Sequence, residues 1–479
     1  MLASACAVGL GLGAMNAGAA TFTVKTGGDA GDLTCDATCT LRDAVDDAEN
    51  TAGTDTIKFD PVAFPLTTST TITLIQDNDL DITQSLIISG PGPGVVTING
   101  NGVDRIFDIF NATPASTVVT VNISGLTLTN GSTGGDGGAI ETDDAKLTIS
   151  NCVFSGNVAI AGEGGAIYSD GFYSTLTVKD SVFTGNSAGY EGGAIYVDDT
   201  SEVAARGVHI SNSRFIGANT ADEGGAIYLD DVDSPVLIEN SVIDGNTAAV
   251  SFGGGIAIDD TDNRGTVTIR NSTISNNTAT TDGGGVFMDD PDNQVLIDNS
   301  TLSGNNASGA ANTGQGGGIY VDYSNNFVRL RNTTVASNYA TDEGGGIYLY
   351  GLSGYSQYQT LMLQNTVVAD NYAANSGPDL RENEGRFLAE FSMIGNTSGA
   401  GVLVNLPGQG TNGGNINDVN PNLGNLENNG GSSKTNALDF FSSPLDRGSN
   451  SICTAASGAT TAALVRDQRG VFRPIDADA

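Results

Sequence analysis

The sequence predicts an all-β protein: a single-stranded right-handed parallel β-helix whose N-terminal end is closed by a short capping helix. Three observations lead to this prediction, namely an internal repeat, a period of two inside each repeat, and a glycine content that disfavours helices. In such a solenoid each coil pairs with the next across about 4.8 Å, so equivalent residues of successive repeats lie above one another.

The repeat is a Gly-Gly-[Ala/Gly]-[Ile/Val] segment that recurs at intervals of about 27 to 33 residues. Periods in this range indicate stacked supersecondary units. The aliphatic residue of the segment falls at Ile140, Ile167, Ile195, Ile227, Ile256, Val286, Ile319 and Ile347.

The unit that stacks is predicted from the pattern inside one repeat. Segments 192–198 and 208–215 are short, alternate with period two and are bounded by turn-forming residues, which is typical of strands. Glycine contributes 66 of 479 residues, and each glycine costs a helix about 1 kcal/mol relative to alanine. We therefore expect strands in place of the helix pairs of ankyrin or tetratricopeptide arrays.

The alternation also assigns faces. In the glycine-containing strand, Ile195 and Val197 share the inward side, which leaves Tyr196 outward beside a trough of small residues. This outward column of rings is the candidate ligand-binding face, and it consists of Tyr168, Tyr196, Tyr228, Phe287, Tyr320 and Tyr348. The rings would either stack on a ligand or only stiffen the sheet, because cross-strand aromatic pairs contribute about 0.2–1 kcal/mol each.

Aspartates follow the same strand and predict a ladder of carboxylates. Their mutual repulsion favours bound cations, and Ca²⁺ fits hard oxygen ligands best, although simple solvation of acidic turns is the alternative. The candidate metal ligands are Asp198, Asp199, Asp230, Asp231, Asp259, Asp260, Asp289 and Asp290. A second acidic column is expected to face the first, and it consists of Asp136, Glu163, Glu191, Glu223, Asp282 and Glu343.

Two asparagine columns have predicted structural roles. The first is expected to hydrogen-bond its stacked amides along the ladder, and it runs through Asn151, Asn212, Asn240, Asn271, Asn299, Asn332 and Asn365. The second is expected to supply left-handed backbone angles at turns, which Asn tolerates. It runs through Asn157, Asn186, Asn219, Asn246, Asn277, Asn305, Asn338 and Asn371.

The repeats resemble those of polymorphic outer membrane proteins. The resemblance rests on Gly-Gly-Ala-Ile, as at residues 137–140 and 164–167, and on Phe-x-x-Asn at Phe154 and Phe183. It covers about half of the chain, and it implies a surface or secreted right-handed β-helix with a role in adhesion.

The N-terminal region predicts that the chain is exported and that a cap closes this end of the β-helix. Residues 1–20 are small and apolar and are expected to be a signal peptide, followed by a cap over 21–60 and repeats over 61–375. Leu41, Ala44, Val45 and Ala48 have helical spacing, with Thr40 and Asp43 placed as a capping box.

The cap segment resembles the CSLREA domain of exported bacterial β-helix proteins. We expect Cys35 and Cys39 to form a local disulfide in an oxidising compartment, with two free thiols or a metal pair as the alternatives.

The C-terminal region, 376–479, changes to runs of Asn, Gly and Pro. Its motifs resemble the choice-of-anchor Q domain, and they are Asn420-Pro-Asn-Leu-Gly, Thr435-Asn-Ala-Leu, Ser443-Pro-Leu-Asp and Asp467-Gln-Arg-Gly. That resemblance implies surface attachment, but the sorting anchor of that family does not follow these motifs. We therefore expect either a truncated chain or an unanchored secreted form, and the partner of Cys453 is left open.

The net charge and the scarcity of basic residues limit the classes of function that the chain can have. With a net charge of −36 the chain should repel nucleic acid and anionic lipid while attracting cations. Its single histidine, His209, is expected to be an ordinary surface residue, and no segment beyond the leader approaches the roughly 20 apolar residues of a membrane span.

We accordingly predict an exported surface or secreted monomer with no catalytic residues, adhesive or structural, which presents its Tyr/Gly/Asp face to a glycan, a surface protein or Ca²⁺, with no other cofactor. The alternatives are a polysaccharide lyase or hydrolase acting on acidic glycans and the passenger of an autotransporter. A lyase needs a base near a neutralising cation, and a hydrolase needs two separated carboxylates.

Overall fold

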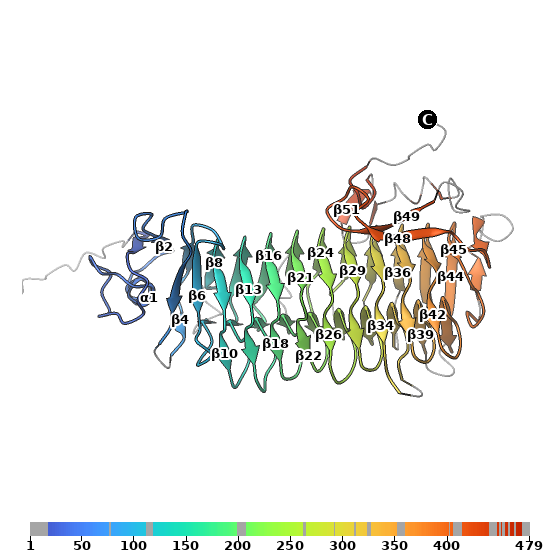
Figure 1. Cartoon of the computed structure of the whole chain (residues 1–479), viewed down its shortest axis with the longest axis horizontal. Helices are drawn as coiled ribbons and strands as arrows, with labels where there is room; N and C mark the ends of the chain where they lie inside the picture. Colours follow the sequence, from blue (N-terminus) through green and yellow to red (C-terminus); the bar gives the residue numbers. More distant parts are fainter. Residues whose placement is uncertain are drawn as a thin grey trace, which may run out of the picture.

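The chain forms an elongated rod of stacked coils in a computed structural model (Figure 1). The structure describes residues 18–471 except 76–77, 112–117, 199–206, 262–264, 292, 311–312, 323–326, 352–359, 402, 406–413, 440–447, 450–451, 453–455, 458–459 and 464–465. Most of the predicted leader, together with Asp199 and Cys453, therefore lies outside the described residues.

Four parallel sheets, which we call A to D, make the walls of the rod, and each coil of its central part contributes a strand to every sheet in turn. All pairing between coils is parallel and in register; for example, Ile227 pairs with Ile256 and Asp230 with Asp259. This confirms the predicted parallel β-helix.

Sheet A has 14 strands. They are β1 (Thr21–Val24), β2 (Asp55–Phe59), β5 (Leu86–Ser89), β8 (Thr120–Ser124), β12 (Lys146–Ser150), β16 (Thr175–Lys179), β20 (Val208–Ser211), β24 (Val236–Glu239), β28 (Val267–Arg270), β32 (Val295–Asp298), β36 (Phe327–Arg331), β40 (Thr360–Gln364), β44 (Arg386–Glu390) and β46 (Leu403–Asn405).

Sheet B has 13 strands. They are β3 (Thr70–Thr73), β6 (Val96–Asn99), β9 (Thr127–Thr129), β13 (Val153–Ser155), β17 (Val182–Thr184), β21 (Arg214–Ile216), β25 (Val242–Asp244), β29 (Thr273–Ser275), β33 (Thr301–Ser303), β37 (Thr334–Ala336), β41 (Val367–Ala369), β45 (Met393–Ile394) and β47 (Ile416–Asn417).

Sheet C has 11 strands and carries the predicted aromatic column. They are β4 (Leu80–Ile82), β7 (Phe107–Phe110), β11 (Ile140–Asp143), β15 (Ile167–Asp170), β19 (Ile195–Val197), β23 (Ile227–Asp230), β27 (Ile256–Asp259), β31 (Val286–Asp289), β35 (Ile319–Val321), β39 (Ile347–Tyr350) and β43 (Leu380–Asn383).

Sheet D has 9 strands of two residues each. They are β10 (Ser132–Thr133), β14 (Val158–Ala159), β18 (Ser187–Ala188), β22 (Thr220–Ala221), β26 (Thr247–Ala248), β30 (Thr278–Ala279), β34 (Asn306–Ala307), β38 (Tyr339–Ala340) and β42 (Tyr372–Ala373). The parallel coils of the four sheets extend on both sides of the range 61–375 that was expected for the repeats, from β1 to β47.

A single described helix, α1 (Leu41–Glu49), covers the N-terminal end of the rod and packs against β1, β2 and β4. Its apolar side is buried, and the predicted capping box is present, since Thr40 Oγ1 accepts from the Asp43 amide while an Asp43 carboxylate oxygen accepts from the Thr40 amide. Cys35 and Cys39 form a disulfide beside the helix. None of the described helices is long and apolar enough to cross a membrane.

The second asparagine column, predicted only to supply turns, forms the buried amide ladder. Asn246 is fully buried and its Nδ2 donates to Asn277 Oδ1 at 2.9 Å, a contact that recurs from coil to coil along the second column. The first column supplies the positive-φ turns, for example with φ 52° at Asn240, and it also makes some of its predicted amide bonds, such as Asn299 Nδ2 to Asn271 Oδ1 at 2.6 Å. The sequence showed two regular Asn columns but not which one points into the core, and an amide ladder stabilises most where water cannot compete for its hydrogen bonds.

The C-terminal region folds back onto the rod. An antiparallel hairpin of β48 (Leu423–Glu427) and β49 (Thr435–Leu438) lies along the outside of sheet B (Figure 1). A second hairpin is formed by β50 (Ala456–Ser457) and β51 (Thr460–Ala463). The side chain of Gln468 joins this region to the coils, because its Nε2 donates to the Ser272 carbonyl at 3.0 Å and its Oε1 accepts from Thr301 Oγ1 at 2.8 Å.

Candidate functional site

The outer surface of sheet C carries the predicted rings between two columns of acids, and we call this surface the aromatic–acid face. Ile227 and Leu229 point into the core, while Tyr228 and Asp230 point outward on the same strand. The rings form two stacks with centroid separations of 5.2 to 5.6 Å, and these stacks are Tyr168–Tyr196–Tyr228 and Phe287–Tyr320–Tyr348. Phe252 lies between the stacks, at the coil where Ala257 replaces the ring.

Five of the six outward rings are buried and Tyr168 is half-buried, which favours the alternative that the rings stiffen the sheet. Tyr228 is 2% exposed, and Phe287, the first ring of the second stack, is 5% exposed. At Tyr228 one cause is the glycine four residues earlier. Gly224 has φ +58°, and a Cβ there would meet Tyr228 Cδ2 at 2.9 Å, so the ring packs against the glycine backbone. The face therefore offers ring edges and carboxylates more than flat ring surfaces.

The tyrosine hydroxyls connect one coil to the next. Tyr196 Oη donates to Asp230 Oδ2 at 2.8 Å, and Tyr228 Oη donates to Asp259 Oδ2 at 2.9 Å. Burial, followed by the charge of these aspartates, raises the pKa of both phenols far above its usual range. The phenols therefore stay protonated and act as hydrogen-bond donors.

The second acidic column does face the rings. Burial and the neighbouring Glu163 and Glu223 raise the pKa of Glu191 to about 8, and burial raises the pKa of Asp282 to about 6. Burial also raises the pKa of Asp230 on the opposite side of the rings. With a pKa of about 8, Glu191 holds a proton at neutral pH that a carboxyl in water would have lost.

The predicted metal ligands form a line along the rod. Asp230, Asp259 and Asp289 lie in register on successive strands, so the first and third are separated by two coils, or about 10 Å. One Ca²⁺ gathers six to eight oxygens at about 2.3–2.6 Å, and a single file of carboxylates does not enclose an ion in this way. Asp231, Asp260 and Asp290 occupy positive-φ turn positions beside that file, and Asp198 follows β19.

One grouping of three acids in the described part of the chain is close enough to share an ion, and it lies elsewhere, at Asp79, Asp81 and Asp108. Arg105 forms ion pairs with Asp79 at 3.5 Å and with Asp108 at 3.8 Å. The guanidinium therefore already supplies positive charge to this cluster.

His209 and two arginines of sheet A are held in ion pairs. His209 Nε2 lies 3.0 Å from Glu239 Oε1, and Arg270 Nη2 lies 2.6 Å from Glu239 Oε2. Burial alone would raise the pKa of Glu239, but the hydrogen bonds from Arg270 and His209 bring it below its usual value. On the following coils Arg331 pairs with Asp298 at 3.0 Å, and both side chains are buried.

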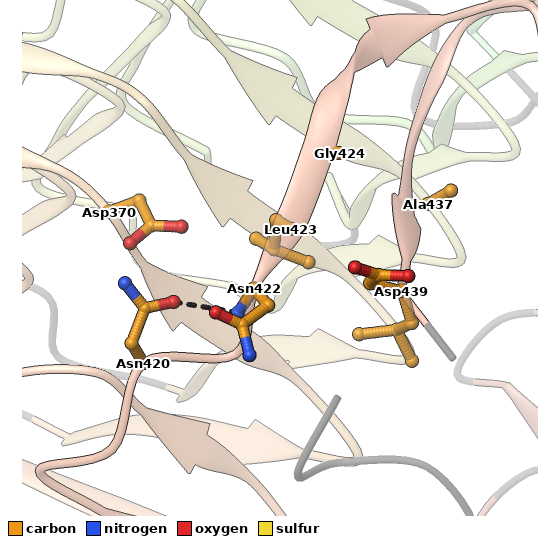
Figure 2. Close-up of a pocket in the computed structure, with 8 residues that line it drawn as sticks. Asp370, Asn420, Asn422, Leu423, Gly424, Ala437 and Asp439 are labelled. Carbon is orange, nitrogen blue, oxygen red and sulfur yellow. Dashed lines mark hydrogen bonds between the residues drawn. The ribbon is translucent and has the colours of Figure 1, made fainter. Parts of the chain in front are cut away.

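A polar pocket that the sequence did not predict lies where the β48–β49 hairpin meets the rod. Its volume is about 510 Å³, and it is lined by Asp370, Asn420, Asn422, Leu423, Gly424, Ala437, Leu438 and Asp439. Figure 2 shows Asp370 and Asn420 on one side of Asn422 and Leu423, and Asp439 on the other side at the end of β49. The motifs at Asn420 and Thr435 were the available signal, but a pocket between segments so distant in sequence requires the fold-back.

The comparisons agree with the fold. The family described as right handed beta helix region matches residues 193–384, which confirms the predicted handedness, and the Chlamydia polymorphic membrane protein repeat matches residues 151–170 and 180–198. No curated protein sequence matches the chain.

Two solved structures are similar at low identity. The A-module of mannuronan C-5 epimerase AlgE4 from Azotobacter vinelandii has 14% identity and a TM-score of 0.41, and the match covers 83% of this chain and 96% of that one. Tailspike protein 3 of bacteriophage CBA120 has 12% identity and a TM-score of 0.34, covering 69% of this chain and 56% of that one. At these scores neither likeness bears on function. The chain is thus a right-handed parallel β-helix that carries polymorphic membrane protein repeats, which indicate a surface-exposed protein.

Proposed function

We propose that this protein is an exported, non-catalytic surface or secreted rod with an adhesive role towards a glycan or a surface protein. The observation that carries the proposal is that the side chains of the aromatic–acid face make their contacts with one another. Each of the buried rings stacks on at least one neighbouring ring, and hydroxyls such as Tyr196 Oη donate to the aspartate of the next coil. This chemistry holds the coils in register, and a rigid rod of this kind can display a binding surface away from its point of attachment.

The contacts of the basic residues favour this proposal over a polysaccharide lyase. A lyase needs a base beside a cation that can neutralise a uronate. His209 and Arg270 share Glu239, and Arg331 is buried against Asp298. Recruiting any of these cations for a uronate would leave a half-buried or buried carboxylate unpaired, which costs several kcal/mol for a buried ion pair.

Turnover and adhesion assays test the proposal. The purified chain is incubated with pectin, alginate and chondroitin while unsaturated-uronate absorbance and new reducing ends are followed, and we expect no sustained release of product. In parallel, beads coated with the chain should adhere to cells or to immobilised glycans, whereas beads coated with albumin should not. Sustained turnover on any polymer, or beads that adhere no better than the control, would refute it.

We also propose that the acidic columns attract Ca²⁺ as a diffuse stabilising cation. The net charge of −36 and the file of carboxylates through Asp230 and Asp259 support this, because cations reduce repulsion between neighbouring coils. Millimolar Ca²⁺ should raise the melting temperature more than NaCl of equal ionic strength does. A melting temperature that is indifferent to Ca²⁺ and to chelator would contradict this proposal.

A further inference from the structure

Two tyrosines on sheet D differ from the rings of sheet C because they are exposed. Tyr339 and Tyr372 stack with their ring centroids 5.1 Å apart and their planes within 8°. Their exposed fractions are 41% and 54%, whereas the stacked Tyr348 of sheet C is 2% exposed. A stacked aromatic pair left open on an otherwise polar surface is a feature of binding sites, because burying it on a partner recovers its hydrophobic free energy.

The position of Tyr372 leaves one face of its ring open among the described strands. The residues in register before it are Thr278, Asn306 and Tyr339, so the ring of Tyr339 covers one face. β42 is the last strand of sheet D, while sheets A, B and C continue for at least one further coil. The opposite face of the ring is therefore not covered by a following strand of its own sheet.

The polar pocket of Figure 2 is lined by a residue that lies close to Tyr372 in the chain. Asp370, which lines the pocket, occupies the corner between β41 and β42 with φ +59°, two residues before Tyr372. Two residues of chain span at most about 7 Å. A ligand held beside Asp370 therefore lies within a short backbone distance of Tyr372.

The lining of the pocket selects an uncharged, hydroxyl-rich ligand. Asp370 and Asp439 contribute carboxylates, and Asn420 and Asn422 contribute amides, while no basic side chain is among the described lining residues. Carboxylates and amides bind hydroxyl groups well, but two carboxylates on a chain of net charge −36 repel anionic sugars. Leu423 and Leu438 add apolar surface, and the volume of about 510 Å³ lies within the usual range of ligand pockets.

We propose that this pocket and the open face of Tyr372, together the hairpin site, bind a neutral oligosaccharide. The C–H faces of a pyranose ring would pack on Tyr372, because C–H groups are attracted to the negative face of an aromatic ring. The hydroxyl groups of the next sugar would bond to Asp370, Asp439 and the amides of the loop. This inference rests on the proposed adhesive function and names its ligand class and its place on the rod.

Glycan binding by the full chain and matched variants tests the inference. The probes are neutral gluco-, xylo-, manno- and galacto-oligosaccharides, oligouronates as an anionic arm, and Ca²⁺ alone, each titrated by calorimetry. Tyr372→Ala should weaken binding of a neutral oligosaccharide at least tenfold, and Asp370→Asn should weaken it several-fold, whereas Tyr372→Phe should retain it. Tyr190→Ala is the matched control, since Tyr190 is 53% exposed on another coil.

The outcomes separate this site from the proposed function. Binding of oligouronates alone, binding of Ca²⁺ alone, or neutral binding that Tyr372→Ala leaves unchanged would overturn the hairpin site. If beads adhere to cells but bind none of the oligosaccharides, the adhesive function stands and the hairpin site does not. Melting temperatures of all variants are compared first, and agreement with the unsubstituted chain shows that any loss of binding is local.

Discussion

Tyr228 illustrates how one repeated residue contributes to this rod. Its ring is stacked on Tyr196, its Cβ side lies against Gly224, and its hydroxyl reaches Asp259 on the next coil. The same side chain therefore adds dispersion, burial and a hydrogen bond between coils. A residue that looks like a ligand contact in the sequence is here a connection between repeats.

The hydrogen bond of that connection can be measured. Tyr228→Phe removes the donor to Asp259 while keeping the ring, and we expect it to lower the free energy of unfolding by about 1 kcal/mol. Equilibrium urea unfolding provides the measurement. Tyr190→Phe, at an exposed position, should have almost no effect, and equal losses in both variants would contradict a specific role for the Tyr228 hydroxyl.

The different burial of the two asparagine columns gives a second prediction. Asn246→Ala removes the bonds of Nδ2 to Asn277 Oδ1 and to the Phe215 carbonyl, and it strands buried partners, so we expect a loss of about 3 kcal/mol. Asn240→Gly keeps the positive φ of 52° accessible and should cost only a few tenths of a kcal/mol. Thermal and urea unfolding of the two variants should rank them in this order, and the reverse order would restore the roles expected from the sequence.

The fold-back of the C-terminal region shows how separate elements meet through a few polar contacts. Gln468 bonds to Ser272 and Thr301 on the rod and to Ser433 Oγ beside β49, at 2.9 Å in the last case. Ser433 is buried. The amide of Gln468 thus joins the chain terminus, the hairpin and two coils at one point.

We expect Gln468→Ala to loosen this hairpin without unfolding the rod. Losing several hydrogen bonds of about 1 kcal/mol each should speed amide hydrogen exchange in residues 423–438, while exchange in β24 and β28 stays the same. Gln294→Ala, at an exposed position on the rod, is the control. Unchanged exchange in the hairpin would mean that other contacts hold it.

At the scale of the whole molecule, the aromatic–acid face holds many partly buried carboxyl groups. Their raised pKa values make the free energy of unfolding depend on pH. Burial raises the pKa of Glu191 to about 8 and that of Asp143 to about 6, whereas in the unfolded chain such groups titrate near 4. The folded state therefore binds more protons between these values. The stabilisation from these groups is complete below about pH 4 and is lost as the pH rises through 6 to 8.

The rod should accordingly melt at a higher temperature at pH 5 than at pH 8.5. Glu191→Gln should flatten this dependence and stabilise the rod at pH 8.5 by about 1 kcal/mol, a figure reduced for solvent screening of a half-buried group. Glu427→Gln removes the same charge from an exposed position on β48 and should change little. A melting temperature that increases from pH 5 to pH 8.5 would contradict the assignment.

Much of the architecture follows from local patterns in the sequence. The Gly-Gly-Ala-Ile repeat and its alternation predicted the parallel coils and the inward side of Ile227, and the spacing around Thr40 predicted helix α1 and its capping box. These features depend on steric and hydrogen-bonding preferences within a few residues, so they are readable without coordinates.

The tertiary structure alone decided which side chains stay accessible. Whether a ring that points away from the core is open depends on how closely the neighbouring coils and the glycine backbone approach it, which buries Tyr228 and leaves Tyr372 exposed. The pocket between Asp370 and Asp439 exists because the C-terminal hairpin returns to the rod. Accessibility is a property of contacts between segments far apart in the chain, and no local pattern records those contacts.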